Sequence, residues 1–160
     1  MRSHAVLFLM FVLAGCGQAS ETTTNIPAQA TSPAPTAALD AGGVINALKA
    51  TGLPITEVNV LTEATDTNKM MGRPNGYTSK AFFVDQRHEG EGVEPSEQNT
   101  VEVFPDADGA TRRREFIEGV TKEMPMFTQY IIQSGPILLR LDKVVTPTEA
   151  KEYEEALAKL

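Results

Sequence analysis

The chain has 160 residues, one cysteine, no tryptophan and a formal net charge of −7. A single cysteine excludes an internal disulfide, and the acidic balance argues against general nucleic-acid binding, which needs a basic surface. Because an acidic chain is repelled by an anionic membrane surface, residence at a membrane would require an anchor.

The N-terminal residues have the pattern of a bacterial signal peptide. A positively charged start precedes an apolar run over residues 5–12, which is shorter than the about 20 residues that span a bilayer. Leu13-Ala14-Gly15-Cys16 follows and resembles the lipobox of bacterial lipoproteins. The resemblance implies cleavage after residue 15 and a diacylglyceryl group on Cys16. We therefore expect residues 1–15 to be a signal peptide and the protein to be held at the cell membrane, on its extracytoplasmic face.

A segment of low complexity separates Cys16 from the rest of the chain. Residues 17–39 are mostly Ala, Thr, Ser, Gln and Pro, with one charged residue, Glu21. Pro27, Pro33 and Pro35 are incompatible with a regular helix or strand, and the composition cannot bury enough apolar surface to fold. We expect residues 16–39 to be a flexible tether and residues 40–160 to be one globular domain.

The first half of this domain contains one predicted helix and two predicted strands. The helix should start at the cap residue Asp40 and end at Gly52. A strand is expected over residues 56–61, where apolar residues alternate around Val58 and Val60. After a long loop over residues 62–76, residues 77–85 should form a second strand, with one face formed by Tyr77, Ala81 and Phe83.

The second half continues with three strands and two helices. Residues 100–104 predict a strand that sets Val101 and Val103 against Glu102. A helix should run from Asp106 or Asp108 to Glu123, with Arg112–Arg114 largely off its apolar stripe, which is made of Ala110, Phe116, Ile117 and Val120. Residues 127–132 and 137–141 predict a hairpin, and a capping box at Thr146 starts the last helix, which should bury Ala150, Tyr153, Leu157 and Leu160.

The expected order is therefore α-β-β-β-α-β-β-α. It predicts an α+β fold, in which helices pack on a single, mostly antiparallel sheet.

Several short motifs between residues 53 and 157 occur together. They are Asn68-Lys69, Met71-Gly72-Arg73-Pro74, Gly76–Lys80, Val101–Phe104, Ile137–Leu141, Thr146-Pro147 and Glu152–Glu154. With these motifs the chain resembles a family of small uncharacterised lipoproteins from actinobacteria and other Gram-positive bacteria. The resemblance implies an anchor and a single domain, and it implies no reaction. The tract over residues 86–98 departs from the family pattern.

No catalytic residue, cofactor or metal is assigned from the sequence. The lipid on Cys16 would consume the only thiol, and His88 lies in a Glu/Gly-rich loop without a nucleophile-elbow pattern, as expected of an exposed loop histidine. The acids of that loop can collect a hard cation, although a solvated acidic loop is commoner; they are Glu89, Glu91, Glu94 and Glu97.

The segment over residues 66–80 is the candidate ligand surface. It combines turn residues with isolated cations and one tyrosine, and the proposed contacts are Lys69, Arg73, Tyr77 and Lys80. The alternative is a loop that folds over a sheet edge and pairs its charges internally.

These observations favour a membrane-anchored binding or accessory protein, whose partner is an unknown small molecule or protein, over an enzyme. A small envelope hydrolase that uses carboxylates and a purely structural envelope component stay open. A hydrolase of that kind needs a close pair of carboxyl groups in a concave site, and no spacing in the sequence marks such a pair.

Overall fold

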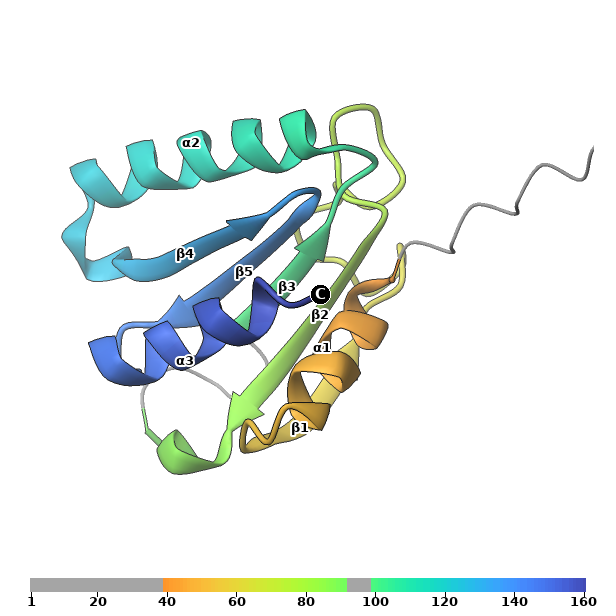
Figure 1. Cartoon of the computed structure of the whole chain (residues 1–160). Coiled ribbons are helices and arrows are strands. Elements are labelled where there is room, and N and C mark those ends of the chain that lie inside the picture. Colours follow the sequence, from red (N-terminus) through yellow and green to blue (C-terminus); the bar gives the residue numbers. More distant parts are fainter. Residues whose placement is uncertain (1–38, 92–98) are drawn as a thin grey trace, which may run out of the picture. The chain divides into compact units, whose positions relative to one another are not determined.

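Alternating apolar residues build five strands that pair into one antiparallel sheet in the computed structural model, which describes residues 39–91 and 99–160 (Figure 1). The strands are β1 (Ile55–Val60), β2 (Ser79–Asp85), β3 (Asn99–Val103), β4 (Gln129–Ser134) and β5 (Ile137–Asp142), in the spatial order β1-β2-β3-β5-β4. The predicted signal peptide, Cys16 and most of the predicted tether lie outside the described residues.

The described helices cover both faces of the sheet. Helices α1 (Ala41–Ala50) and α3 (Pro147–Leu157) lie on one face, in front of the sheet in Figure 1, and α2 (Ala107–Glu123) packs on the other face. Two 3₁₀ turns, η1 (Gln86–His88) and η3 (Pro125–Phe127), follow β2 and α2. The predicted α+β class with one antiparallel sheet is therefore confirmed, and so is the order of the helices and strands.

The predicted helix starts are made by side-chain caps. The Asp40 carboxylate accepts the Gly43 amide at 2.7 Å, and Asp106 accepts the Gly109 amide at the same distance. Thr146 and Glu149 form the reciprocal capping box of α3. These short-range bonds satisfy amide groups that have no partner within the first turn of a helix, which is why the sequence predicts them well.

The two faces of the sheet carry clusters of different size. The α1/α3 face holds the main core, with side chains such as Val44, Leu48, Phe83, Leu139, Leu141, Tyr153 and Leu157. The α2 face holds a smaller cluster of Tyr77, Phe104, Ala110, Ile117 and Leu138. Burial of apolar area contributes about 25 cal/mol per Å², so most of this stabilisation comes from the α1/α3 face.

Strand β1 differs from its prediction. It begins at Ile55, which is buried, whereas Val58 and Val60 are 40% and 52% exposed. The pairing of β1 with β2 shifts between Thr56 and Asn59, and Glu57 has a φ of 46°, so the alternation of faces is interrupted there. A bulge of this kind cannot be recognised from periodicity alone.

Three aromatic or apolar residues also lie elsewhere than expected. Tyr77 precedes β2 and packs edge-on against Phe104 at a centroid distance of 6.0 Å, on the α2 face and not with Ala81 and Phe83. Phe127 belongs to η3 and is 53% exposed, because β4 begins two residues later than predicted. Leu160 is also exposed, since α3 ends at Leu157.

Candidate functional site

A carboxylate is buried on the α2 face of the sheet. Glu102 stands in the middle of β3 between Val101 and Val103, and its side chain is fully shielded from solvent. An ionised carboxylate in such a place requires close cationic partners, because it has lost its water.

Three cations from three different elements surround Glu102. Arg113 of α2 donates to it from Nε at 3.0 Å and from Nη2 at 3.2 Å. Arg140 of β5 donates from Nη1 at 3.2 Å, and Nζ of Lys80 on β2 lies 3.9 Å away. The cross-strand registers Lys80↔Glu102 and Glu102↔Leu138 place these side chains on one face.

This cluster carries more positive than negative charge. Three cations share one carboxylate, and the nearby buried Asp66 only partly offsets the difference through its attraction to Lys80. Burial lowers the pKa of Lys80 and of Arg140, opposed in each case by the charge of Glu102. Within the described part of the chain, Nη1 of Arg113 and Nη2 of Arg140 donate no hydrogen bond.

The two arginines line a groove between α2, η3 and the ends of β4 and β5. This α2–η3 groove has a volume of about 480 Å³, and its lining residues are Asn68, Arg113, Phe116, Ile117, Val120, Thr121, Met126, Phe127, Thr128, Gln129, Arg140, Asp142 and Lys143. Three apolar side chains of the groove are unusually accessible: Phe116 is 62%, Met126 70% and Phe127 53% exposed. The groove therefore combines cationic donors with apolar walls.

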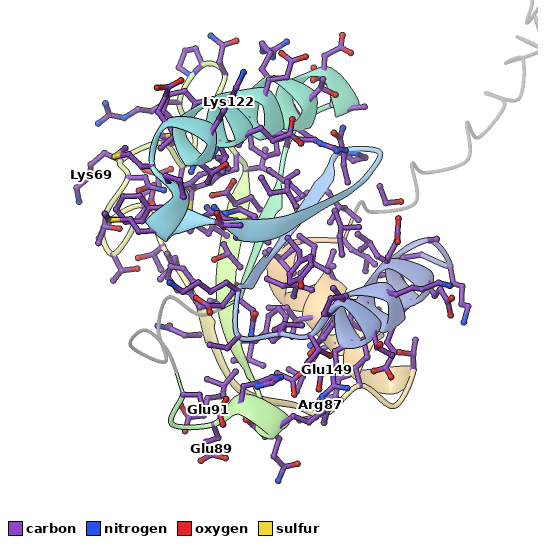
Figure 2. All side chains as sticks on the ribbon, turned by 90° about the vertical axis from the view of Figure 1, so that its left-hand side faces the viewer. Lys69, Arg87, Glu89, Glu91, Lys122 and Glu149 are labelled. Atoms are coloured by element: carbon purple, nitrogen blue, oxygen red, sulfur yellow. The ribbon has the colours of Figure 1, made fainter. Side chains whose placement is uncertain are left out.

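The structure separates the four residues of the predicted ligand surface. Lys69 and Arg73 are exposed on the loop that precedes β2, and Lys69 points away from the sheet (Figure 2). Tyr77 and Lys80 are buried, with exposures of 0% and 3%. A ligand on the surface cannot reach the buried pair, whereas a ligand role of Lys69 and Arg73 stays a prediction.

Asp66 organises the loop that carries these residues. Its carboxylate accepts the Tyr77 hydroxyl at 2.6 Å and the amides of Asn68, Met70 and Met71. Burial would raise the Asp66 pKa, but these hydrogen bonds outweigh it and lower the pKa. The loop contributes Asn68 to the rim of the α2–η3 groove, so it takes part in the candidate site through a residue outside the predicted set.

The sequence analysis does not predict which residues form the α2–η3 groove. The prediction that Arg112–Arg114 lie largely off the apolar stripe is wrong for Arg113, whose side chain is only 11% exposed. Phe116, which periodicity places on the apolar stripe, is 62% exposed and lines the groove. A usable signal was present, since Glu102 and Arg140 each interrupt an apolar strand that lies in the interior of the sheet.

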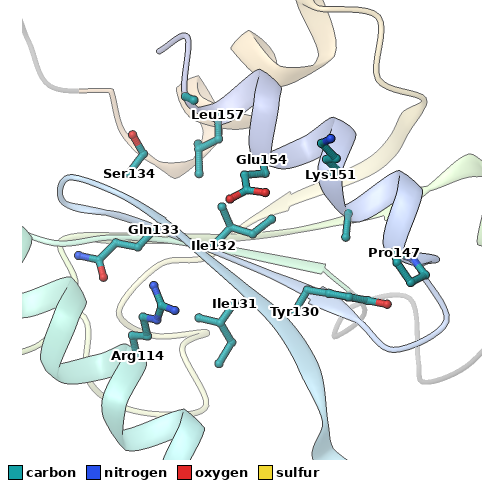
Figure 3. Close-up of a pocket in the computed structure, with 12 residues that line it drawn as sticks. Arg114, Tyr130, Ile131, Ile132, Gln133, Ser134, Pro147, Lys151, Glu154 and Leu157 are labelled. Carbon is teal, nitrogen blue, oxygen red and sulfur yellow. The ribbon is translucent and has the colours of Figure 1, made fainter.

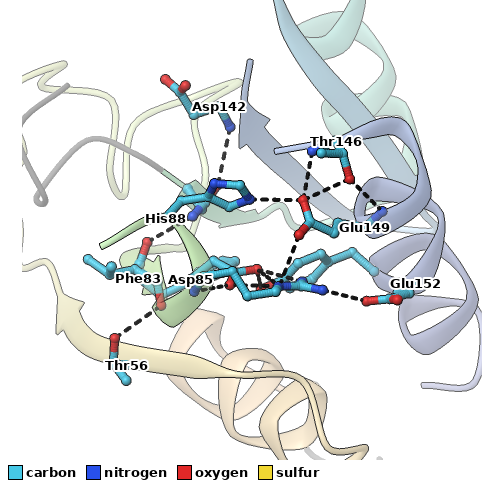
Figure 4. Close-up of polar contacts among 12 residues, drawn as sticks. Thr56, Phe83, Asp85, His88, Asp142, Thr146, Glu149 and Glu152 are labelled. Atoms are coloured by element: carbon cyan, nitrogen blue, oxygen red, sulfur yellow. Dashed lines mark hydrogen bonds and ion pairs between the residues drawn. The ribbon is translucent and has the colours of Figure 1, made fainter. Parts of the chain in front are cut away.

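A second polar cluster joins the end of β2 to α3 (Figure 4). Arg87 binds the buried Asp85 carboxylate at 2.7 Å and Glu152 at 2.8 Å. Nε2 of His88 lies 2.8 Å from Glu149, the residue that also closes the capping box of α3. His88 is therefore 9% exposed, and the prediction of an exposed loop histidine is wrong.

The charges in this second cluster shift each other's pKa. The hydrogen bond to Glu149 raises the pKa of His88 against the opposing effect of burial. Burial would raise the pKa of Glu149, but hydrogen bonds from Thr146 and His88 lower it to about 2. Because Asp85, Arg87 and His88, at the end of β2 and in η1, bind Tyr153, Glu152 and Glu149 of α3, we interpret the cluster as a clamp on the fold.

Two of the four acids considered as cation ligands, Glu94 and Glu97, lie outside the described residues. Among residues 39–91 and 99–160, no three His, Cys, Asp or Glu side chains come together as a metal site.

No protein-family model, curated protein or solved structure matches the chain. In the described part of the chain, none of the helices has both the length and the apolar character needed to cross a bilayer. Function is therefore inferred from the groove and from the sequence around Cys16.

Neighbouring arginines on α2 provide a matched test of the buried cluster. We expect Arg113→Gln to lower the free energy of unfolding by about 2–4 kcal/mol, because Glu102 loses a two-point charged partner. Arg114 forms an exposed pair with Glu118, so Arg114→Gln should cost no more than about 0.5 kcal/mol. Urea unfolding of both variants measures the difference, and equal stabilities would contradict the assignment of Arg113 to the cluster.

The second cluster predicts a dependence of stability on pH. His88 has a raised pKa in the folded protein, so its contribution is complete below its ordinary pKa of 6.5 and declines as the pH rises through the folded value. Glu149 stays ionised down to a pH of about 2. The difference in unfolding free energy between wild type and His88→Gln should therefore be largest near pH 5.5 and smaller at pH 9.

Glu149→Gln serves as the control for this measurement. In that background the pH-dependent part of the His88→Gln effect should be reduced, because the carboxylate that attracts the imidazolium is gone. A His88→Gln effect that is independent of pH would refute the ion-pair interpretation.

Proposed function

We propose that this protein is a lipid-anchored binding protein of the bacterial cell envelope, which holds an anionic ligand with an apolar portion in the α2–η3 groove. The observation that carries the proposal is the pair of arginines, Arg113 and Arg140, which line the groove while sharing one buried carboxylate with Lys80.

The charge of the site favours an anion. Arg113 and Arg140 each keep N–H donors beyond those used on Glu102, and a guanidinium group binds carboxylate or phosphate oxygens in a planar, two-point manner. Lys143 adds a third cation to the residues that line the groove. Among the described residues of this lining, Asp142 is the only carboxylate. In a chain with a net charge of −7, this local excess of cations is the exception.

The walls favour a ligand that also has an apolar part. Phe116, Met126 and Phe127 stay more than half exposed, and apolar side chains gathered around one concavity are typical of ligand-binding grooves. Methionine adapts its shape to irregular ligands. A purely ionic ligand would leave these side chains uncovered.

The remaining alternatives fit the groove less well. A hydrolase that uses one carboxyl group as the acid and another as the base needs the two groups close together. Glu102 is occupied by its ion pairs, and among the described residues that line the groove Asp142 is the only one with a carboxyl group. A purely structural envelope component would not need arginine N–H groups that have no partner among the described residues and that lie beside exposed apolar side chains.

Titration with dodecyl phosphate tests the binding proposal. We expect a chain that starts at Pro35, once its cooperative unfolding is verified, to bind this probe by calorimetry below its micelle concentration. Arg140→Gln should weaken binding at least about tenfold, since a charge-assisted hydrogen bond contributes about 1.5–3 kcal/mol. Phe127→Ser should also weaken binding while leaving the melting temperature nearly unchanged, because the side chain is 53% exposed.

Two controls separate specific binding from detergent-like adsorption. Arg114→Gln should bind the probe as the wild type does, because Arg114 is not part of the groove. A neutral alkyl glucoside of the same chain length should bind much more weakly. Equal binding of the glucoside, or full affinity in folded Arg140→Gln, would rule out the proposed site.

The proposed anchor is tested separately at Cys16. Replacing Cys16 with Ser removes the thiol that would carry the lipid, so the variant should keep its leader and incorporate no labelled fatty acid. The wild type should appear in the membrane fraction with the mass of a lipidated N-terminal cysteine. An unmodified cysteine at the mature N-terminus of the wild type would disprove the anchor.

A further inference from the structure

The two edges of the sheet are protected to different degrees against pairing with another strand. The β1 edge has a shift in register, a charged residue with a positive φ at Glu57, and Pro54 just before it. The β4 edge has a regular register from Gln129↔Asp142 to Ser134↔Ile137, and its sequence, QYIIQS, contains neither charge nor proline. Proteins normally block exposed edges with such features, so the regular, uncharged β4 edge requires an explanation.

The hairpin geometry determines which backbone groups of β4 face outward. The turn between β4 and β5 has two residues, and Gly135 with a φ of 54° followed by Pro136 is typical of a type II′ turn. Ser134 and Ile137 are then a hydrogen-bonded pair, and so are Ile132 and Tyr130 with their partners. The amide and carbonyl groups of Gln129, Ile131 and Gln133 consequently point to the open side of β4.

A groove runs along this open side. Strand β4 passes between α3 and α2, and side chains of all three elements line a space of about 480 Å³ (Figure 3). Tyr130, Ile131 and Ile132 are only half-buried there. No strand among the described residues pairs with this side of β4, and the groove lies beside it.

We propose that β4 pairs antiparallel with β4 of a second copy of this chain, about a twofold axis through Ile131, so that the two sheets become one. This register joins the outward groups of Gln129 and Gln133 across the interface. It sets Tyr130 opposite Ile132 of the partner subunit and Ile131 opposite Ile131 of the partner subunit. Aromatic–aliphatic and aliphatic pairs across strands are stabilising, and no like charges meet. The strand is therefore complementary to itself, as a twofold interface requires.

The charges beside the strand fit the same symmetry. A twofold axis perpendicular to the sheet places the two α3 helices side by side and antiparallel on one face. The groove side of α3 carries Lys151 and Glu154, which are opposite in charge and one turn apart. In the dimer, Lys151 of one copy can therefore face Glu154 of the partner subunit, and the reverse. On the α2 face, Arg114 also lines the groove, and it pairs with Glu118 of its own helix. A strand from an unrelated protein would not require this self-matching arrangement.

Disulfide trapping in intact envelopes tests the pairing with the full chain. Directly opposed residues of a hydrogen-bonded antiparallel pair have Cα atoms about 5.5 Å apart, which suits a disulfide. We expect Ile131→Cys to give a covalent dimer after mild oxidation. Val58→Cys on the β1 edge is the matched control and should give no covalent dimer. The parent chain, whose only cysteine is Cys16, shows how much dimer Cys16 forms by itself.

Paired charges test the register. In the Ile131→Cys background, Gln129→Glu with Gln133→Glu places two carboxylates opposite each other and should reduce the dimer yield at least about tenfold. Gln129→Glu with Gln133→Lys changes the same positions but makes attractive pairs, so it should restore the dimer. Gln129→Glu keeps an oxygen acceptor for Nε of Arg140, which lies 2.8 Å from Gln129 Oε1.

Three results would overturn the proposal. They are a dimer yield of Ile131→Cys no higher than that of Val58→Cys, a yield that is the same in both charge variants, and a disulfide between Ile131→Cys and a different protein. Limited proteolysis checks that each variant is folded. If the charge variants do not fold, the comparison of Ile131→Cys with Val58→Cys alone decides the proposal.

Discussion

Burial of the Glu102 carboxylate is the constraint on which the α2 side of the molecule depends. An ionised group there must be matched by cations, and these come from β2, β5 and α2, so the ion pairs fix how α2 lies against the sheet. Apolar residues of similar size often stabilise a fold as well as a buried ion cluster does. The cluster is therefore better explained by the charge that it presents at the groove than by stability alone.

The two faces of the sheet differ in their residues: one face holds most of the buried apolar core, and the other holds most of the candidate binding groups. The α1/α3 face is closed by a large apolar cluster, and the clamp of Arg87, His88 and Glu149 reinforces it at the end of β2. The α2 face has few buried apolar residues, leaves Phe116 exposed and concentrates cations. A stable core on one face allows the other face to keep exposed apolar groups and arginine donors that bind no other described residue, which are features that folding alone would select against.

Local signals explain what the sequence could predict. The caps at Asp40, Asp106 and Thr146 and the hairpin turn between residues 132 and 137 involve residues within a few positions of each other, so composition and spacing reveal them. The groove depends on contacts between distant positions, such as Glu102 with Arg140, 38 residues apart. The alternation of residues in β3 predicts that one face of the strand is apolar. It does not predict that Glu102, on the other face, is buried, because the burial depends on the packing of α2, a separate element that follows β3 in the chain.

Gln129 links the two proposed binding surfaces. Its side chain accepts a hydrogen bond from Arg140 and lines the α2–η3 groove, while its backbone belongs to the open edge of β4. An anion that draws Arg140 toward the groove competes with Gln129 for the Nε donor, and pairing of β4 with a second copy restrains the backbone that carries Gln129. If both proposals hold, occupation of the groove and pairing of the edge act on the same residue, and any change that one makes in the free energy of the other is matched by an equal change in the reverse direction.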